Sequence, residues 1–173
     1  MIESFNTVPE STGPFEIKEK GSRFISQCFS VRSKEAAEDI VKKLWKEHYN
    51  CTHICYAYLI GEGKIELFRY NDDGEPSGTA GLPIYNEILR KELFNVLVTS
   101  VRYYGGVNLG TGGLARTYGL SARTVLDNVS PVLVEIKSPV TIEAPYDLTG
   151  LAMNTINRTS KIEIISKSYS DSG

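Results

Sequence analysis

The sequence predicts an α+β fold, because it contains both helical and strand-like patterns and no internal repeat. Apolar residues recur at helical spacing to about residue 48, starting after Ser33, a residue type suited to cap a helix. The nearly continuous, valine-rich run NVLVTSVRYY (95–104) has the pattern of a central strand buried on both faces. A chain of 173 residues, 41% of them hydrophobic, can bury a sizeable core.

Shorter patterns fill the rest of the N-terminal part. The segment 15–31, interrupted by a Lys-Gly-Ser sequence, is expected to form one or two strands. Two strand-like runs flank the glycine-rich connection 61–63, which predicts a hairpin. The segment 71–83, called the acidic loop below, has no periodicity, and a loop of this length is either functional or a misread element. A short helix is expected after it, and a longer helix should begin near Gly112 or Gly113.

The C-terminal part is expected to form a second, smaller domain. The sequence DNVSP (127–131) has the composition of a linker, so we expect domains at 1–130 and 131–173. A unit of this length is near the size below which a domain rarely folds alone. Its expected elements are a strand over 132–145, a short helix within 146–159 and a strand over 161–166.

The overall composition excludes several classes of protein. The net charge of −2 gives no general attraction to nucleic acid or to an anionic membrane, so any basic recognition surface must be local. No apolar run approaches the ~20 residues that span a bilayer, and the N-terminus lacks the pattern of a signal peptide. Three cysteines, an odd number, argue against a disulfide framework. We therefore expect a soluble cytoplasmic protein that does not act at a membrane.

The sequence RYYGGVNLGTGGLARTYG (102–119), called the glycine motif below, predicts an anion site. Arg102 ends the buried strand, and the glycines lead into a helix N-terminus, whose free amides and dipole favour an anion. Arg116 lies off the apolar stripe of that helix and can supply a fork of donors. The alternative is structural: the glycines permit tight turns, and Arg102 pairs with Asp73 or Glu75. The spacing matches neither a Walker A nor a dinucleotide-binding pattern.

The acidic loop and the sequence CTHIC (51–55) contain residue types that bind metal ions. In the acidic loop the calcium-loop pattern fails, because its first and last positions are not carboxylates; Mg²⁺ bound together with a phosphate stays an alternative. In CTHIC, a zinc site at Cys51, His53 and Cys55 is the alternative to buried thiols and a hydrogen-bonded histidine. His53 as a general base has no supporting motif, and no catalytic triad is present. We expect no metal or other cofactor and assign no catalytic residue.

Two long motifs occur in the order DDGEPSGTAGLP (72–83) and the glycine motif, together with Ser22–Ile25 and with His53, Cys55 and Ala57. In these residues the chain resembles the IMPACT family, which includes the bacterial YigZ-like proteins. Over about residues 15–130, the resemblance implies a fold like the second domain of ribosomal protein S-five, a mixed sheet with packed helices. It also implies that PYDLTG opens a ferredoxin-like unit, like domain five of elongation factor G, of which this chain contains the first half.

The resemblance also implies a role in translation. The family's eukaryotic members are translational regulators, which favours a non-catalytic module that binds RNA, the ribosome or a regulatory protein partner. The alternative is an enzyme or sensor for a small phosphorylated ligand, because LGTGGLA resembles the phosphate loop of GHMP kinases. The expected binding residues for an RNA phosphate or another anion are Arg23, His53, Asp73, Glu75, Arg102, Tyr103, Gly105, Gly106, Gly110, Thr111, Gly112, Gly113 and Arg116.

Overall fold

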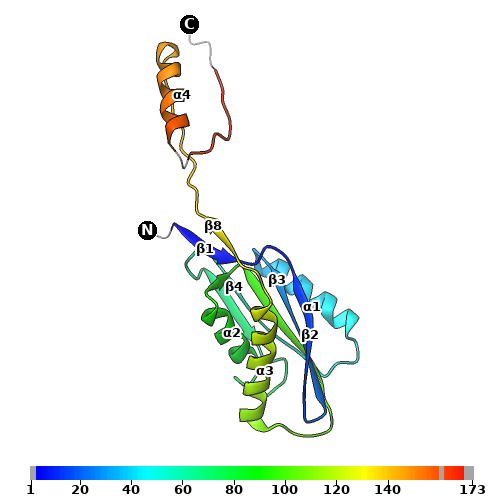
Figure 1. Cartoon of the computed structure of the whole chain (residues 1–173). Coiled ribbons are helices and arrows are strands. Elements are labelled where there is room, and N and C mark those ends of the chain that lie inside the picture. Colours follow the sequence, from blue (N-terminus) through cyan, green and yellow to red (C-terminus); the bar gives the residue numbers. More distant parts are fainter. Residues whose placement is uncertain (1–2, 160–161, 170–173) are drawn as a thin grey trace. The chain divides into compact units, whose positions relative to one another are not determined.

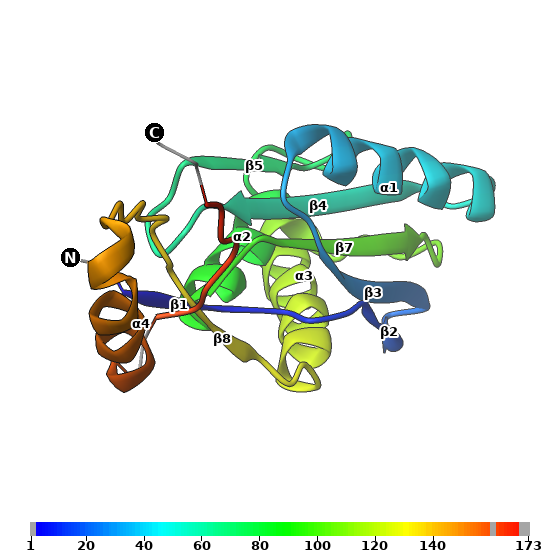
Figure 2. The ribbon, with the colours of Figure 1, turned by 90° about the horizontal axis from the view of Figure 1, so that it is seen from above.

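The strand predicted around residue 100 lies at the centre of the main sheet. The computed structural model describes residues 3–159 and 162–169, and the chain divides into two compact units, Met1–Lys137 and Ser138–Gly173. In the first unit, five strands pair in the order β2-β3-β7-β4-β5, and Figure 2 shows them side by side. Their bounds are β2 Thr12–Glu19, β3 Ser22–Ser30, β7 Val96–Tyr103, β4 His53–Ile60 and β5 Leu67–Asn71. The α+β class is confirmed.

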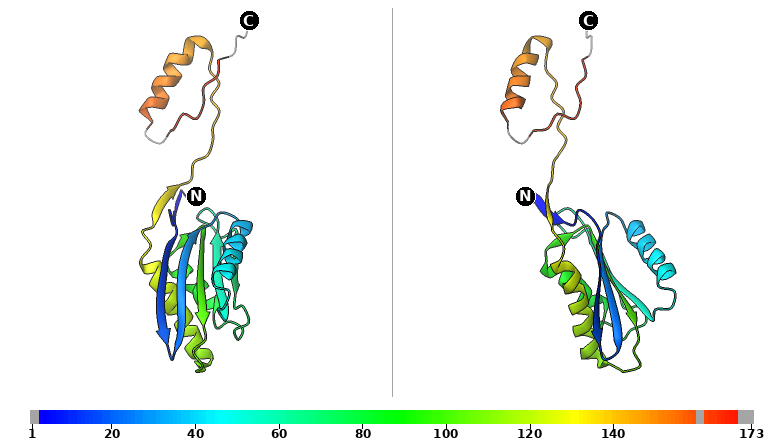
Figure 3. Two further views of the ribbon diagram at one scale, coloured as in Figure 1. Left: turned by 90° about the vertical axis from the view of Figure 1, so that its right-hand side faces the viewer. Right: turned by 45° about the vertical axis from the view of Figure 1, so that its right-hand side comes forward.

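Helices cover both faces of this sheet. Helix α1 (Lys34–Glu47) lies on one face, and α2 (Gly81–Arg90) and α3 (Gly110–Asp127) lie on the other (Figure 3). Side chains of β7 alternate between the two cores: Val98 packs on the α2 and α3 side and Leu97 on the α1 side, both fully buried. The prediction that this strand is buried on both faces is therefore confirmed.

The helix boundaries follow from local sequence. The Ser33 hydroxyl accepts a hydrogen bond from the backbone N–H of Ala36 at 3.1 Å, so the predicted cap of α1 is confirmed. Helix α3 begins at Gly110, slightly earlier than expected, because glycine there adopts φ +71° and the chain turns directly into the helix. All pairings in the main sheet are antiparallel, so the end of β7 is not the shared carboxyl edge of a parallel sheet.

A small second sheet closes one side of the first unit. Strand β1 (Ser4–Thr7) pairs in parallel with β6 (Leu93–Phe94) and antiparallel with β8 (Val132–Glu135). The prediction of a strand over 132–145 was wrong beyond Glu135, since the residues that follow pair with no strand in the described chain. Strand β8 lies in the first unit because its partner β1 does.

The second unit contains a single-turn helix, η1 (Tyr146–Leu148), followed by α4 (Thr149–Arg158), which confirms the predicted helix. The strand expected over 161–166 begins outside the described residues, and residues 162–166 form no strand. The ferredoxin-like assignment of this segment stays a prediction. In the parts of the chain that the structure describes, no helix is both long and apolar enough to cross a membrane.

Two glycines bring the β2–β3 turn and the β7–α3 loop into close contact. A Cβ atom at Gly105 would overlap the backbone of Gly21, which itself has φ +81°. We expect Gly105→Ala to lower the free energy of unfolding by about 3 kcal/mol, because two backbones must separate. Gly112→Ala is the matched control, since its Cβ enters open space on a helix, and it should be neutral or stabilising by up to about 1 kcal/mol. Urea unfolding measures both; equal losses would contradict the predicted close approach.

Candidate functional site

A buried ion pair connects the glycine motif to the acidic loop. Arg102 Nη1 donates to Glu75 Oε1 at 2.6 Å, and the two side chains are only 6% and 5% exposed. The Tyr118 hydroxyl, from α3, donates to the same oxygen at 2.7 Å. His53 Nε2 lies 4.0 Å from it. Four segments therefore meet at one carboxylate.

The remaining surface of Arg102 is also occupied by protein. Its Nη2 donates to Ser22 Oγ at 3.4 Å, and its guanidinium carbon lies 5.4 Å from the ring centre of Phe24 and 5.3 Å from that of Tyr104. Its Nε is buried and has no hydrogen-bond partner among the described residues. Because the guanidinium group of Arg102 is held by these contacts inside the protein, it is not positioned to contact an anion on the surface. The environment of Arg102 therefore matches the structural alternative given above, in which this arginine pairs with an acidic residue of the acidic loop.

The acidic loop is held by its own aspartates. The Asp72 carboxylate accepts hydrogen bonds from the amides of Gly78, Ala80 and Gly81 at 2.8–2.9 Å. The last of these is the first free N–H group of α2. The Asp73 carboxylate accepts from the Ile54 amide at 2.7 Å, tying the loop to β4. The long loop is therefore an ordered connection rather than a misread element.

The pKa shifts of the nearby acid and thiol groups favour a structural role over a reactive one. Burial raises the pKa of Asp73, although a hydrogen bond from Ile54 opposes the rise. Burial also raises the pKa of the Cys55 thiol, which donates to the Asp72 carbonyl at 3.1 Å, and raises that of Cys28 to about 12. These thiols stay protonated at neutral pH and are therefore weak nucleophiles.

The residues considered as metal ligands do not converge. Cys55 lies in the core beneath α2 and α3, whereas Cys51 packs against the core on the α1 side. His53 Nδ1 is hydrogen-bonded to the Asp73 carbonyl at 2.6 Å. Within the described residues, no group of three His, Cys, Asp or Glu side chains is placed to hold a metal ion.

The accessible part of the glycine motif borders a hollow. The β2–β3 turn, the β7–α3 loop and the first turn of α3 lie at one end of the first unit (Figure 1). Between the turn and α3 is a hollow of about 190 Å³, called the basic hollow below. Its lining consists of Ile17, Lys18, Glu19, Lys20, Leu109, Gly113, Arg116, Thr117 and Leu120.

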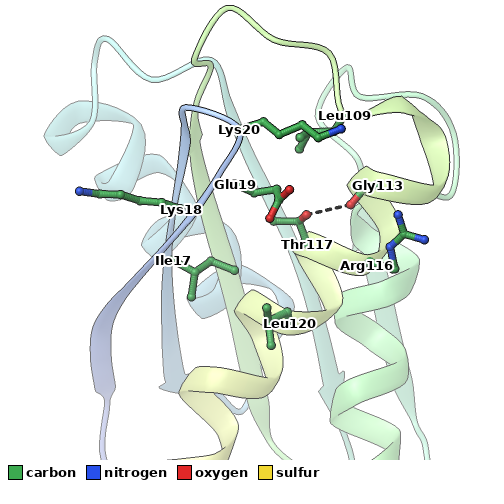
Figure 4. A pocket seen from close by; sticks show the side chains of 9 residues that line it. All are labelled: Ile17, Lys18, Glu19, Lys20, Leu109, Gly113, Arg116, Thr117 and Leu120. Atoms are coloured by element: carbon green, nitrogen blue, oxygen red, sulfur yellow. Dashed lines mark hydrogen bonds between the residues drawn. The ribbon is translucent and has the colours of Figure 1, made fainter.

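The charges around the basic hollow are unequal. Figure 4 shows Lys20 reaching across to Leu109, Lys18 pointing away from α3, and Arg116 extending outward beside Gly113. Lys18 is ion-paired with Glu16 at 3.6 Å. Among the described residues, no side chain forms a capping hydrogen bond at the N-terminus of α3, so its amides add positive potential. Glu19 is the opposing charge, and Lys20, Arg116 and the helix end outweigh it.

Arg116 differs from the neighbouring arginine on the same helix. Arg123 donates to both oxygens of Glu87, the shorter bond being 2.7 Å. Arg116 forms no ion pair within the described residues and lies between the basic hollow and a second hollow against α2. It is thus the arginine of α3 that is available to a ligand.

The structure divides the predicted site residues into three groups. The first lies inward: Glu75 and Arg102 are buried, and His53 and Asp73 are partly buried. The second, Arg23 and Tyr103, lies on the α1 side of the sheet, where the Arg23 guanidinium carbon is 5.2 Å from the Tyr103 ring centre. The third lies on the β7–α3 loop and the first turns of α3: Gly105, Gly106, Gly110, Thr111, Gly112, Gly113 and Arg116.

Three residues beside these groups are absent from the predicted site. Tyr118 falls on the apolar stripe of α3, and the partner of its hydroxyl cannot be inferred from the sequence. The Ser22 hydroxyl, at the start of β3, accepts hydrogen bonds from the Gly105 amide at 3.1 Å and from Arg102 Nη2 at 3.4 Å. Lys20 lies in the turn between β2 and β3. The signal for its place in the site that the sequence offers is a positive charge beside a Gly-Ser pair.

Comparisons with known proteins identify the family of this chain. The family model of the Impact N-terminal domain matches residues 20–126, more than half of the chain. The chain belongs to the IMPACT family. It is 36% identical over 159 residues to the IMPACT family member YvyE of Bacillus subtilis, covering 92% of this chain and 72% of the relative. An IMPACT family member of Haemophilus influenzae is 32% identical over 163 residues, or 94% and 79% of the two chains.

A solved structure supports the fold of this IMPACT chain. The crystal structure of a hypothetical protein aligns over 91% of this chain and 76% of its own length, with a TM-score of 0.74 and 28% sequence identity. The resemblance seen in the two motifs is thereby confirmed at the level of family and fold.

The buried pair predicts different roles for two arginines of the glycine motif. Arg102→Ala should cost about 3–5 kcal/mol of unfolding free energy, because Glu75 is left buried without its charged partner. Arg116→Ala, on the surface, should change it by no more than about 0.5 kcal/mol. Thermal and urea unfolding of both variants test this. The double variant Arg102→Met/Glu75→Leu should recover part of the loss; similar small effects of both single variants would contradict a structural role for Arg102.

Proposed function

We propose that this IMPACT-family chain is a non-catalytic, translation-associated protein that binds RNA phosphates at the basic hollow. The observation that carries the proposal is the exposed pair Lys20 and Arg116 beside the uncapped N-terminus of α3. Free helix amides and nearby cations together suit a phosphate group. This assignment keeps Arg116 as an anion-binding residue and replaces Arg102, which is buried, by Lys20.

The proposed absence of catalysis is supported by how the reactive groups are used. Asp72 and Asp73 accept backbone hydrogen bonds, and Glu75 is bound by Arg102 and Tyr118. A general acid or base must reach a substrate, and these carboxylates are directed into the protein. The link to translation and to the cytoplasm rests on the family, whose eukaryotic members regulate translation.

A small phosphorylated ligand is the second candidate, because a hollow of about 190 Å³ can enclose a phosphate and a small attached group. Such a ligand would raise the melting temperature in proportion to the logarithm of its concentration above Kd. A melting-temperature rise with a sugar phosphate, at a concentration where RNA of equal phosphate content gives none, would favour this candidate over RNA.

The RNA proposal predicts a defined salt dependence. Binding of a single-stranded RNA, measured by fluorescence anisotropy between about 50 and 200 mM salt, should weaken as a power of the salt concentration. Lys20→Ala and Arg116→Ala should each reduce that exponent by about 0.7, because each removes one phosphate contact. Lys64→Ala, an exposed lysine between β4 and β5 at the other end of the sheet, is the control and should leave it unchanged. Affinity that is independent of salt would contradict phosphate contacts.

Glu19 supplies a test of opposite sign. It lines the basic hollow, where its carboxylate repels a bound phosphate. Glu19→Gln should therefore tighten RNA binding by several-fold at low salt, and the gain should shrink as salt is added. Glu47→Gln, at the end of α1, is the matched control and should have a smaller effect. A loss of affinity in Glu19→Gln would contradict an anion in this hollow.

A further inference from the structure

A second hollow lies on the other side of α3, between this helix and α2. Its volume is about 370 Å³, and it is called the α2–α3 hollow below. This volume falls within the range of ~300–1,000 Å³ that is usual for small-molecule sites, whereas the basic hollow, at about 190 Å³, lies below that range. A ligand that uses both hollows therefore places its larger part in the α2–α3 hollow. The lining of this hollow includes Pro83, Asn86 and Glu87 of α2 and Gly119, Leu120 and Arg123 of α3.

The two hollows are joined along one row of side chains. Arg116 and Leu120 line both of them, and residues four apart on a helix lie on the same face. Both side chains are exposed, so this row can be reached from either hollow. Arg116 already belongs to the proposed phosphate site. A phosphate held by Arg116 therefore brings the group attached to it to the edge of the α2–α3 hollow.

The charges of the α2–α3 hollow are balanced, unlike those of the basic hollow. The Glu87 carboxylate accepts hydrogen bonds from Arg90 Nε at 2.6 Å and from Arg123 Nη2 at 2.7 Å. Among the described residues that line this hollow, Arg116 is the cation outside that network, and it lies on the shared row. A second phosphate would find no further free cation here. The α2–α3 hollow therefore suits an uncharged group.

One polar side chain of this hollow is free to recognise such a group. The Asn86 side chain is exposed and has no hydrogen-bond partner within the described residues. Its amide carries both a donor and an acceptor. Pro83, Ala115 and Leu120 supply apolar surface in the same hollow. Apolar surface beside one amide suits a flat ring with a hydrogen-bonding edge, and asparagine pairs in particular with the adjacent N6 donor and N7 acceptor of adenine.

We propose that the α2–α3 hollow is the base subsite for an adenine nucleotide whose phosphate lies at the basic hollow. The inference rests on the proposed function and specifies the nucleotide that the RNA presents there. The adenine ring lies against Pro83 and Leu120, its N6 and N7 atoms face the Asn86 amide, and Arg116 binds the phosphate between the two hollows. A base that is paired in a duplex is stacked between its neighbours, so the strand is unpaired at this nucleotide.

The test measures the binding of three strands of about 12 nucleotides to the full chain by fluorescence anisotropy. The first strand alternates cytidine and adenosine, the second has uridine in place of adenosine, and the third has abasic sites there; none of them can pair with itself. We expect the adenosine strand to bind about tenfold more tightly than the abasic strand and several-fold more tightly than the uridine strand. Equal affinities of the three strands, with Lys20→Ala and Arg116→Ala weakening all of them, would overturn the base subsite and leave the proposed function standing.

Variants in the α2–α3 hollow separate the base from the phosphate. Asn86→Ala should remove the preference for adenosine over uridine and leave the salt exponent unchanged, because no charge is lost. Asn50→Ala, an exposed asparagine between α1 and β4, is the matched control and should keep the preference. An unchanged preference in Asn86→Ala would overturn the assignment.

A variant that fills the hollow gives a second readout. Gly119→Leu should lower the affinity for the adenosine strand to that for the abasic strand, and it should leave binding of the abasic strand unchanged. Circular dichroism establishes whether the variant is folded. Gly119→Ala serves if it is not, because its added methyl group would meet the Pro83 side chain in ordinary contact at 3.9 Å.

A free nucleotide has the same chemistry as the nucleotide unit of RNA. Adenosine 5′-monophosphate and ribose 5-phosphate are therefore tested by their effect on the melting temperature. If only the adenosine compound raises it, if Asn86→Ala abolishes the rise, and if no strand binds, the subsite stands with a free nucleotide as its ligand and the RNA proposal fails. If the wild type binds neither a strand nor the adenosine compound at about 50 mM salt, both proposals fall.

Discussion

The ion pair between Arg102 and Glu75 is the interaction on which this end of the molecule depends. It joins the end of the central strand to the acidic loop, and the Tyr118 hydroxyl of α3 donates a hydrogen bond to the same carboxylate. Two charges this deeply buried are costly to desolvate and are tolerated because they are paired and hydrogen-bonded. The arrangement fixes three segments relative to one another: the end of β7, the loop that precedes α2, and the first half of α3. The position of the basic hollow follows from it.

The two conspicuous motifs of the sequence consequently have divided roles. The acidic residues and Arg102 form an internal connection, whereas the glycines, Lys20 and Arg116 remain at the surface. Tyr104 links the two, since its ring rests on the buried guanidinium and also faces solvent. A motif can thus combine scaffold and binding surface within a few residues. The net charge of −2 does not oppose this, because phosphate recognition needs positive potential only locally.

Strong periodicity is what made the main elements predictable. Strand β7, helix α1 and the hairpin of β4 and β5 were expected from apolar spacing and turn residues, and family membership from the two motifs. For the segment 15–31, one or two strands were expected, and it contains parts of β2 and β3. Strands β1 and β6 were missed, because such short strands exist only through pairing with distant segments. The orientation of Arg102 was left open between an inward pair and a surface ligand, since a strand end faces either way until the loop beside it is folded. Lys20 was missed because proximity to α3 is a tertiary property.

The central claim is that an anionic strand binds at the start of α3 while the Arg102 and Glu75 pair stays intact. Chemical-shift mapping of the ¹⁵N-labelled chain during titration with single-stranded RNA tests it most directly. The account predicts salt-sensitive shifts at the amides of Gly110–Gly113 and Lys20 and at the Arg116 side chain, with the Arg102 Nε–H signal nearly unmoved. Shifts confined to another face, or a large change at Arg102 without change at Gly110–Gly113, would contradict it.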